Sequence, residues 1–134
     1  MKYDNLIAAC NYCILLCKSA VENCRDCQSQ CNNNICENKN KAEDCAVSAQ
    51  NTVDAFQSCI HECNIALEDK SLNEHEKQVI TKCKDTCKET MDRSEQSIEK
   101  ILDQDAEGCL WAIDNFNSCI MACDETIETL SKNK

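Results

Sequence analysis

Cysteine recurs along this chain at the alternating steps of three and four residues by which an α-helix presents one face to a core. In a helical bundle these positions normally hold leucine. The first run steps by 3, 4, 7, 3 and 4, with Ala20 at the one missed position, and consists of Cys10, Cys13, Cys17, Cys24, Cys27 and Cys31. The spacing therefore predicts a long amphipathic helix whose buried face carries sulfur.

Residues that favour strands and tight turns are nearly missing from the sequence. Its 134 residues include no proline and a single glycine, Gly108. β-Hairpins and tight loops usually depend on these two residue types, whereas long helices do without them. We therefore expect an all-α protein, and the length fits one domain over residues 1–134.

Capping signals divide the chain into four helices. We expect the first helix from about Tyr3 to the asparagines at 32–34, followed by a turn over residues 37–40. Asn40 with Glu43 three residues later predicts the start of the second helix.

Polar residues separate the remaining helices. The second helix is expected to end near Leu67, before the polar residues 68–70, and Ser71 with Glu74 predicts a capping box for the third. Asp103 or Asp105 can cap the fourth helix. Gly108, early in this helix, is the one residue that does not favour a helix there. Short connections between such long helices favour an antiparallel up-down-up-down four-helix bundle with a cysteine-lined core.

The inward positions of the later helices keep the same rhythm, except in the third. Those of the second helix are Cys45, Ala49, Thr52, Phe56, Cys59, Cys63 and Ala66, and those of the fourth are Cys109, Ala112, Phe116, Cys119, Cys123, Thr126 and Leu130. In the third helix Cys83 and Cys87 fit. Beyond them the candidates for the inward face are Thr90 and Ser94 or, alternatively, Met91, Ile98 and Leu102.

Charge and segment composition exclude several classes of function. With 24 acidic and 14 basic residues the net charge is -10, which would repel nucleic acid and anionic membrane surfaces. The N-terminus lacks the basic and apolar regions of a signal peptide, and no run of eighteen apolar residues occurs. We therefore expect a cytoplasmic protein without nucleic-acid or membrane partners. In a reducing cytosol, many cysteines indicate metal or redox chemistry before disulfides.

The C-x3-C spacing favours metal binding over disulfide formation. Helix residues four apart have Cβ atoms about 5 to 6 Å apart, whereas a disulfide needs about 3.5 to 4.5 Å. A metal ion fits between two such sulfurs without movement of the backbone. The pairs with this spacing are Cys13/Cys17, Cys59/Cys63, Cys83/Cys87 and Cys119/Cys123.

Ligand type then favours Cu(I) among the candidate metals. Cu(I) is soft and accepts two or three thiolates, so a lattice of inward sulfurs suits several ions. Zinc prefers separate tetrahedral quartets, usually on loops or knuckles. Iron–sulfur clusters rank third, because their C-x2-C runs occur on loops with glycine or proline, whereas here they lie within predicted helices.

Three segments resemble the bacterial four-helix-bundle copper storage proteins. Residues 9–17 match the opening A-C-N-x-C-x3-C of that family, residues 59–64 its second-helix C-x3-C, and residues 109–123 its final-helix spacing, with Ala112 and Phe116 where cysteine is common. The resemblance spans the whole chain and implies an antiparallel bundle whose core cysteines bind many Cu(I) ions. It also implies a homo-oligomer such as a tetramer, and a cytosolic location for members without an export signal.

Antiparallel packing of the four helices divides the cysteines into two groups. We predict two thiolate clusters separated by a drier layer that contains Phe56 and Phe116, and hence a smaller copper load than an uninterrupted stripe would give. The cluster of nine comprises Cys10, Cys13, Cys17, Cys59, Cys63, Cys83, Cys87, Cys119 and Cys123. The group of six comprises Cys24, Cys27, Cys31, Cys36, Cys45 and Cys109.

The predicted function is storage of several Cu(I) ions by these fifteen cysteines, all of them candidate metal ligands. Each ion would displace thiol protons, so binding weakens as the pH falls. The partners expected are copper ions and a copper chaperone or chelator that exchanges them. Weaker candidate ligands are Met91, Met121, His61 and His75, because the methionines suit packing and His61 lies off the inward stripe.

Two alternatives of other classes stay open. One is a protein that binds zinc or another soft metal through thiolates. The other is a disulfide-stapled secreted helical protein, although fifteen cysteines is an odd number and long helices of this kind fold without staples. A redox enzyme is not expected, because no cysteine is placed at a helix N-terminus or beside a base. We therefore predict that the protein is not an enzyme.

Overall fold

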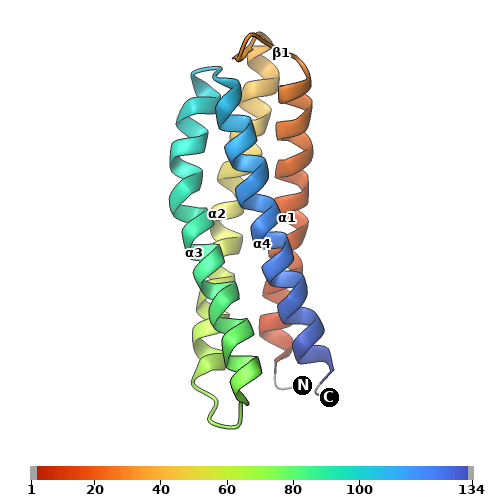
Figure 1. Cartoon of the computed structure of the whole chain (residues 1–134), viewed down its shortest axis with the longest axis vertical. Helices are drawn as coiled ribbons and strands as arrows, with labels where there is room; N and C mark the ends of the chain where they lie inside the picture. Colours follow the sequence, from red (N-terminus) through yellow and green to blue (C-terminus); the bar gives the residue numbers. More distant parts are fainter. Residues whose placement is uncertain (1–2, 133–134) are drawn as a thin grey trace.

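The computed structural model describes residues 3–132 and contains four long helices with a small hairpin between the first two (Figure 1). The elements are α1 (Asp4–Ser29), β1 (Cys31–Asn32), β2 (Ile35–Cys36), α2 (Lys39–Leu67), α3 (Glu74–Leu102) and α4 (Ala106–Ser131). Each helix packs against the next along the chain, and α4 returns to pack against α1. The all-α, antiparallel four-helix bundle with cysteines in its core is confirmed.

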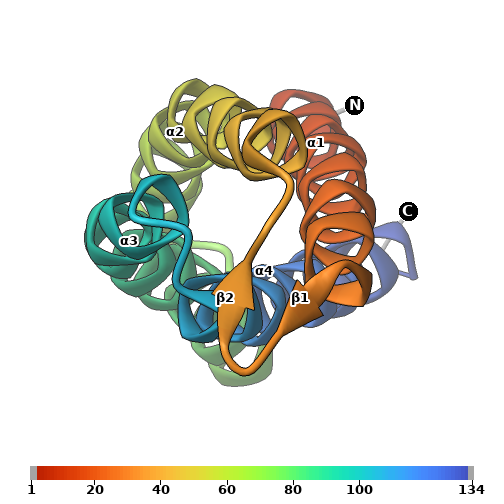
Figure 2. The same ribbon diagram turned by 90° about the horizontal axis from the view of Figure 1, so that it is seen from above.

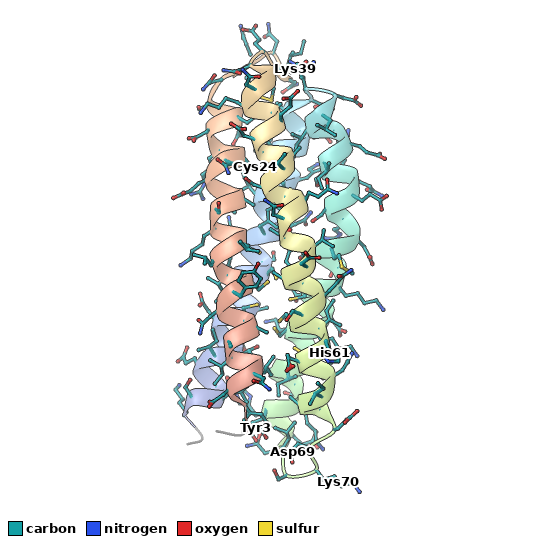
Figure 3. The ribbon with its side chains drawn as sticks, turned by 180° about the vertical axis from the view of Figure 1, so that it is seen from behind. Tyr3, Cys24, Lys39, His61, Asp69 and Lys70 are labelled. Carbon is teal, nitrogen blue, oxygen red and sulfur yellow. A yellow bond between two sulfur atoms is a disulfide. The ribbon has the colours of Figure 1, made fainter. Side chains whose placement is uncertain are left out.

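The two ends of the bundle differ in what closes them. At one end lie the chain termini and the connection between α2 and α3, and we call this the terminal end (Figure 1). Here Tyr3 Oη donates a hydrogen bond of 2.7 Å to Asp69 Oδ2, and the two residues lie together at the base of Figure 3. The other end carries the hairpin and the connection between α3 and α4, and we call it the hairpin end. No helix in the described part of the chain is long and apolar enough to cross a membrane.

A β-hairpin replaces the expected last turn of the first helix. Asn33 and Asn34 form its two-residue turn with φ angles of 54° and 64°. Asparagine tolerates this left-handed conformation and so supplies the turn without glycine. The expectation that this chain lacks the residues for a hairpin was therefore wrong, and α1 ends at Ser29.

The hairpin is fixed onto the connection between α3 and α4. The backbone N–H of Cys36 donates to Gln104 O at 2.7 Å, the side-chain amide of Gln104 donates to Cys36 O at 2.5 Å, and the N–H of Ala106 donates to Asn34 O at 3.0 Å. Viewed from above, the hairpin lies over the end of α4 (Figure 2). The hairpin end is therefore closed by hydrogen bonds between segments that are far apart in the sequence. Cys36 and Gln104, for example, are separated by 68 positions.

Two of the predicted helix caps lie elsewhere. The side chain of Asn38, not Asn40, caps α2 by accepting from the N–H of Lys41. Asn73 and Glu76, not Ser71 and Glu74, form the capping box of α3.

A loop interaction explains the displaced cap of α3. Ser71 is engaged within the loop, where its N–H and its hydroxyl both donate to Asp69 Oδ1. For α4, Asp105 is confirmed as the cap, since its side chain accepts from the N–H of Glu107.

Gly108 allows α3 and α4 to approach closely, so it is not a misfit. A Cβ atom at this position would lie 2.8 Å from Lys100 Cβ, and 2.9 Å from both Ile101 N and Ser97 O. Two of these three contacts are with backbone, which cannot move aside as a side chain can. Any larger residue would push the two helices apart at the hairpin end.

The inward face of α3 is polar between Cys87 and the buried Ile101. Thr90, Ser94 and Ser97 are buried there, Met91 and Ile98 are only partly buried, and Leu102 is 55% exposed. Ser94 donates to Thr90 O at 2.7 Å and Thr90 donates to Asn115 O at 3.3 Å, so both hydroxyls can be buried without losing hydrogen bonds. Of the two registers considered for this helix, the polar one is correct.

Candidate metal centre

Nine buried cysteine thiols line the core near the terminal end. All four helices contribute, with three thiols from α1 and two from each of the other helices. The nine residues are Cys10, Cys13, Cys17, Cys59, Cys63, Cys83, Cys87, Cys119 and Cys123. Each has a relative exposure of 0%. The antiparallel packing thus brings together the nine residues predicted to share one cluster.

One group of four sulfurs takes one cysteine from each helix. Cys10, Cys59, Cys83 and Cys123 have Sγ atoms that all lie within 4.8 Å of one another. Within the group, Cys59 and Cys83 are 3.7 Å apart, Cys10 and Cys59 3.8 Å, and Cys83 and Cys123 3.9 Å. Because the four ligands come from four different helices, the site depends on assembly of the whole bundle.

A second group of four sulfurs adjoins the first. Cys13, Cys87, Cys119 and Cys123 also lie within 4.8 Å of one another, and Cys123 belongs to both groups. The Sγ of Cys119 is 3.4 Å from that of Cys87 and 3.6 Å from that of Cys13. The remaining two thiols of the cluster, Cys17 and Cys63, interact with members of these groups.

The sulfur spacings match those around a soft metal ion. Ligands about 2.3 Å from a central ion are about 3.8 Å apart in a tetrahedron and about 4.0 Å apart in a triangle. Both values lie close to the 3.7 to 4.0 Å separations of the first group. The arrangement is therefore compatible with metal binding by thiolates, in three- or four-coordinate sites.

Hydrogen bonding among the nine thiols divides them into easily ionised and protonated members. Bonds from Cys119 and Cys13 lower the pKa of Cys17 to about 5, against an ordinary value near 9. The pKa values of Cys13 and Cys123 are lowered to about 7, chiefly by hydrogen bonds from Cys119 and Cys10 respectively.

The donors show the complementary shift. The pKa values of Cys10, Cys63, Cys87 and Cys119 are raised, mainly because neighbouring sulfurs favour their protonated form. A thiolate here is thus stabilised by thiols that donate to it, before any cation is bound.

An apolar and hydroxyl layer lies between the nine-thiol cluster and the hairpin end. Phe56 of α2 and Phe116 of α4 stack in the core with ring centroids 6.1 Å apart and an interplanar angle of 25°. Ala20 and Thr52 are also fully buried, and the Thr52 hydroxyl donates to Ala49 O at 2.5 Å. The predicted layer containing Phe56 and Phe116 is therefore present in the core.

The six cysteines of the hairpin end differ from the other nine. Cys24 of α1 forms a disulfide with Cys45 of α2, and Cys31 of β1 forms one with Cys36 of β2. Cys27 and Cys109 remain free, with a raised pKa for Cys27 through burial and a pKa of about 12 for Cys109, also chiefly through burial.

Sequence reasoning missed both disulfides. Neither joins a C-x3-C pair, in keeping with the argument that such pairs are too far apart to oxidise. The four disulfide-bonded residues offer no thiolate while they are oxidised, so the prediction that all fifteen cysteines bind metal requires the reduced protein. One available signal was the pair of asparagines midway between Cys31 and Cys36, which indicates a two-residue turn with the cysteines facing each other.

The histidines lie outside the core. His61 and His75 are exposed, and Figure 3 shows His61 on the outer surface of α2. Met121 is 72% exposed and Met91 is partly buried against the core. Packing of Met121 in the interior was also considered from the sequence and is wrong, because its position on α4 faces solvent.

Comparison with protein-family models, with curated proteins and with solved structures found no match to this chain. Inference about its function therefore depends on the cysteine clusters themselves.

Proposed function

We propose that this protein binds and stores several Cu(I) ions through the thiolates of its core cysteines. The observation that carries the proposal is the continuous cluster of nine buried thiols, in which two four-sulfur groups meet at Cys123. Sulfur is the ligand that Cu(I) prefers, and two or three thiolates satisfy it. A cluster of this size suits many ions rather than one.

Charge balance favours Cu(I) over a divalent ion. Each thiol that binds Cu(I) releases its proton to solvent and becomes a thiolate with one negative charge. When thiolates are shared between ions and one Cu(I) is bound per thiolate, a filled cluster approaches neutrality. Four thiolates around Zn²⁺ leave two uncompensated negative charges, which a core flanked by Phe56 and Phe116 would solvate poorly. The buried location of the nine thiols thus favours monovalent ions in number.

Storage is proposed rather than catalysis. The nine thiols are fully buried, and His61 and His75 are exposed and so are not positioned to act as bases on them. A preformed sulfur cluster can take up ions with little refolding, since neutral thiols already pack as small apolar groups. The proposal agrees with the resemblance to the copper storage proteins. From that resemblance we also propose a cytoplasmic homo-oligomer that exchanges copper with a chaperone or chelator.

An anaerobic titration tests the proposal. Fully reduced, metal-free protein is titrated with Cu(I) against a competing chelator, and the ions bound per chain are counted. We expect tight uptake of many equivalents, weakening as the pH falls because protons compete for the thiolates. Saturation at one or two ions per chain would contradict storage.

Zinc is the second candidate, on one specific observation. The group of Cys10, Cys59, Cys83 and Cys123 takes one ligand from each helix at spacings that fit a tetrahedron. Native mass spectrometry after growth in medium with both metals distinguishes the candidates. One or two zinc ions per chain that resist displacement by Cu(I) would favour a structural zinc site.

A further inference from the structure

Three sulfurs meet at the hairpin end, outside the nine-thiol cluster that carries the storage proposal. Cys31 and Cys36 are cross-strand partners with Cα atoms 4.2 Å apart, and they form a disulfide. Cys27, in the last turn of α1, keeps a free thiol whose Sγ is 3.2 Å from that of Cys36. A thiol this close to a disulfide sulfur is placed to exchange with it.

The three sulfurs differ in their access to solvent. Cys27 and Cys36 are each only 1% exposed, whereas Cys31 is partly exposed. A reagent in solution therefore reaches Cys31 before the other two. Cys36 is bonded to Cys31 and also contacts Cys27, so it is the sulfur through which the other two can exchange.

Backbone hydrogen bonds hold the central sulfur in place. The N–H and the carbonyl of Cys36 are bound by Gln104 through its backbone oxygen and its side-chain amide, respectively. Cys27 is held by α1. The contact between Cys27 and Cys36 thus depends on two segments that are each anchored by hydrogen bonds other than the disulfide itself.

We propose that Cys27, Cys31 and Cys36 form a thiol–disulfide exchange site whose substrate is a low-molecular-weight disulfide of the glutathione class. In the reduced site the Cys31 thiolate attacks one sulfur of the substrate, whose S–S bond breaks to release one thiolate and leave a mixed disulfide on Cys31. The Cys36 thiolate then attacks Cys31 Sγ and releases the second. Two protein thiols are oxidised, one substrate disulfide is reduced to two thiols, and the protons of Cys31 and Cys36 pass to them through solvent.

A third step passes the bond inward. The Cys27 thiolate attacks Cys36 Sγ, the bond between Cys31 and Cys36 breaks, and the electron pair leaves with Cys31 Sγ, which takes up the proton that Cys27 has lost. This exchange needs no further oxidant. It moves the disulfide to the two buried sulfurs and returns Cys31, the accessible one, to its thiol form.

The other disulfide provides an internal comparison. Cys24 and Cys45 are both 0% exposed and join α1 to α2 within the core. Solvent has no direct path to either sulfur, so this bond is expected to resist small disulfides and thiols alike. Any exchange at the hairpin end can therefore be scored against it in the same sample.

The test uses metal-free protein, so its outcome is independent of copper storage. The reduced chain is mixed with oxidised glutathione under argon and quenched with acid at intervals. Free thiols are then alkylated, and disulfides are reduced and alkylated with a heavy form of the reagent. All three sulfurs lie in the tryptic peptide 26–39, in which fragment spectra locate each label. All three cysteines carry the free-thiol label at the start. Once Cys36 has displaced the second glutathione, we expect this label to lie first on Cys27 and later on Cys31, with Cys36 oxidised at both stages.

Variants assign the roles of the outer sulfurs. Cys31→Ser should slow oxidation of Cys36 at least tenfold, whereas Cys63→Ser, which removes a buried thiol of the terminal end, should leave it within twofold. Cys27→Ser should permit the bond between Cys31 and Cys36 but abolish the later return of free Cys31. Helical circular dichroism of each variant confirms folding.

Three results would overturn the proposal. The first is a free-thiol label that stays on Cys27 throughout. The second is free Cys31 that reappears in Cys27→Ser. The third is a trio that remains fully reduced while Cys24 and Cys45 oxidise.

Discussion

Both ends of this bundle are rich in cysteine, yet their chemistry differs. At the terminal end nine thiols stay free, with neighbouring sulfurs 3.4 to 4.0 Å apart. At the hairpin end four of six cysteines form disulfides, across Cα separations of 4.9 and 4.2 Å. Backbone geometry decides the outcome, because one pair joins closely approaching helices and the other joins facing strands. Cysteines of one chain thus remain clustered free thiols at one end and form disulfides at the other.

Ionisation separates the two ends as well. The terminal end lowers the pKa values of Cys13, Cys17 and Cys123, because several thiols donate to each thiolate. The free thiols of the hairpin end have raised pKa values, chiefly because burial disfavours their charged forms. Thiols with lowered pKa values are therefore found at the terminal end, beside the thiols that donate to them.

The largest expected effect is on copper capacity. In fully reduced protein, the triple variant Cys10→Ala, Cys59→Ala, Cys83→Ala should lose more than half of the bound Cu(I), because it breaks the first four-sulfur group. The matched triple variant Cys24→Ala, Cys27→Ala, Cys45→Ala should retain more than half. Copper analysis after anaerobic gel filtration measures both. Equal losses in the two variants would show that the ends do not differ in storage.

A smaller effect concerns stability. The disulfide between Cys24 and Cys45 has a sequence separation of 21 residues, and closure of such a loop stabilises a fold by about 3 kcal/mol. Cys24→Ala with Cys45→Ala should therefore lower the melting temperature by roughly 10 °C without reductant. Reductant should remove most of the difference from the unmodified chain.

The free pair Cys59 and Cys63 provides the control for this comparison. Cys59→Ala with Cys63→Ala removes two buried thiols of α2 without touching a disulfide. The difference in melting temperature between this variant and the unmodified chain should be the same with and without reductant. If reductant does not change the melting temperature of the unmodified protein, the disulfide between Cys24 and Cys45 does not stabilise the fold.

The pH dependence of stability should also differ between the ends. Cys17, with its pKa lowered to about 5, stabilises the folded state above the ordinary thiol pKa near 9, and this contribution is lost as the pH falls toward 5. Cys109, with its pKa raised to about 12, stabilises it below pH 9, and this contribution is lost as the pH rises toward 12. Thermal melts of reduced, metal-free protein at a series of pH values should show two effects. Cys17→Ser should weaken the pH dependence of the melting temperature below pH 9, and Cys109→Ser should weaken it above pH 9. The reverse assignment would contradict the ionisation pattern.

The smallest expected effect is at the exposed candidate ligands. His61→Ala and Met121→Ala should each leave copper capacity unchanged within error, because both side chains face solvent. A loss of one equivalent in either variant would place a copper site on the outer surface. The capacities of these variants also provide the baseline against which the core variants are judged.

Much of the fold and of the terminal-end cluster could be predicted because both follow from helical period alone. Steps of three and four residues place Cys59 and Cys63 on one face, and antiparallel packing brings them to the height of Cys10 and Cys83. Features that depend on local backbone conformation could not be predicted in this way. The asparagine turn at Asn33 was one of them, since left-handed conformations without glycine leave only a weak sequence signal.

Close approach between elements was the other limit. Gly108 appeared to be a defect of α4 when only its own helix was considered, but its reason lies in the backbone of α3. The disulfide between Cys24 and Cys45 likewise depends on the separation between α1 and α2. This separation cannot be deduced from the periodicity of either helix.

The shared membership of Cys123 has a consequence for the order in which ions would bind. One sulfur that belongs to both four-sulfur groups can bridge two ions when both groups are filled, and the second ion then joins a donor that already carries the first. The loading curve should then be cooperative and stepwise, as for a polynuclear cluster. Without this sulfur, two separate triangles would remain, Cys10/Cys59/Cys83 and Cys13/Cys87/Cys119. A single side chain of α4 therefore belongs to both four-sulfur groups and helps to join them into one cluster.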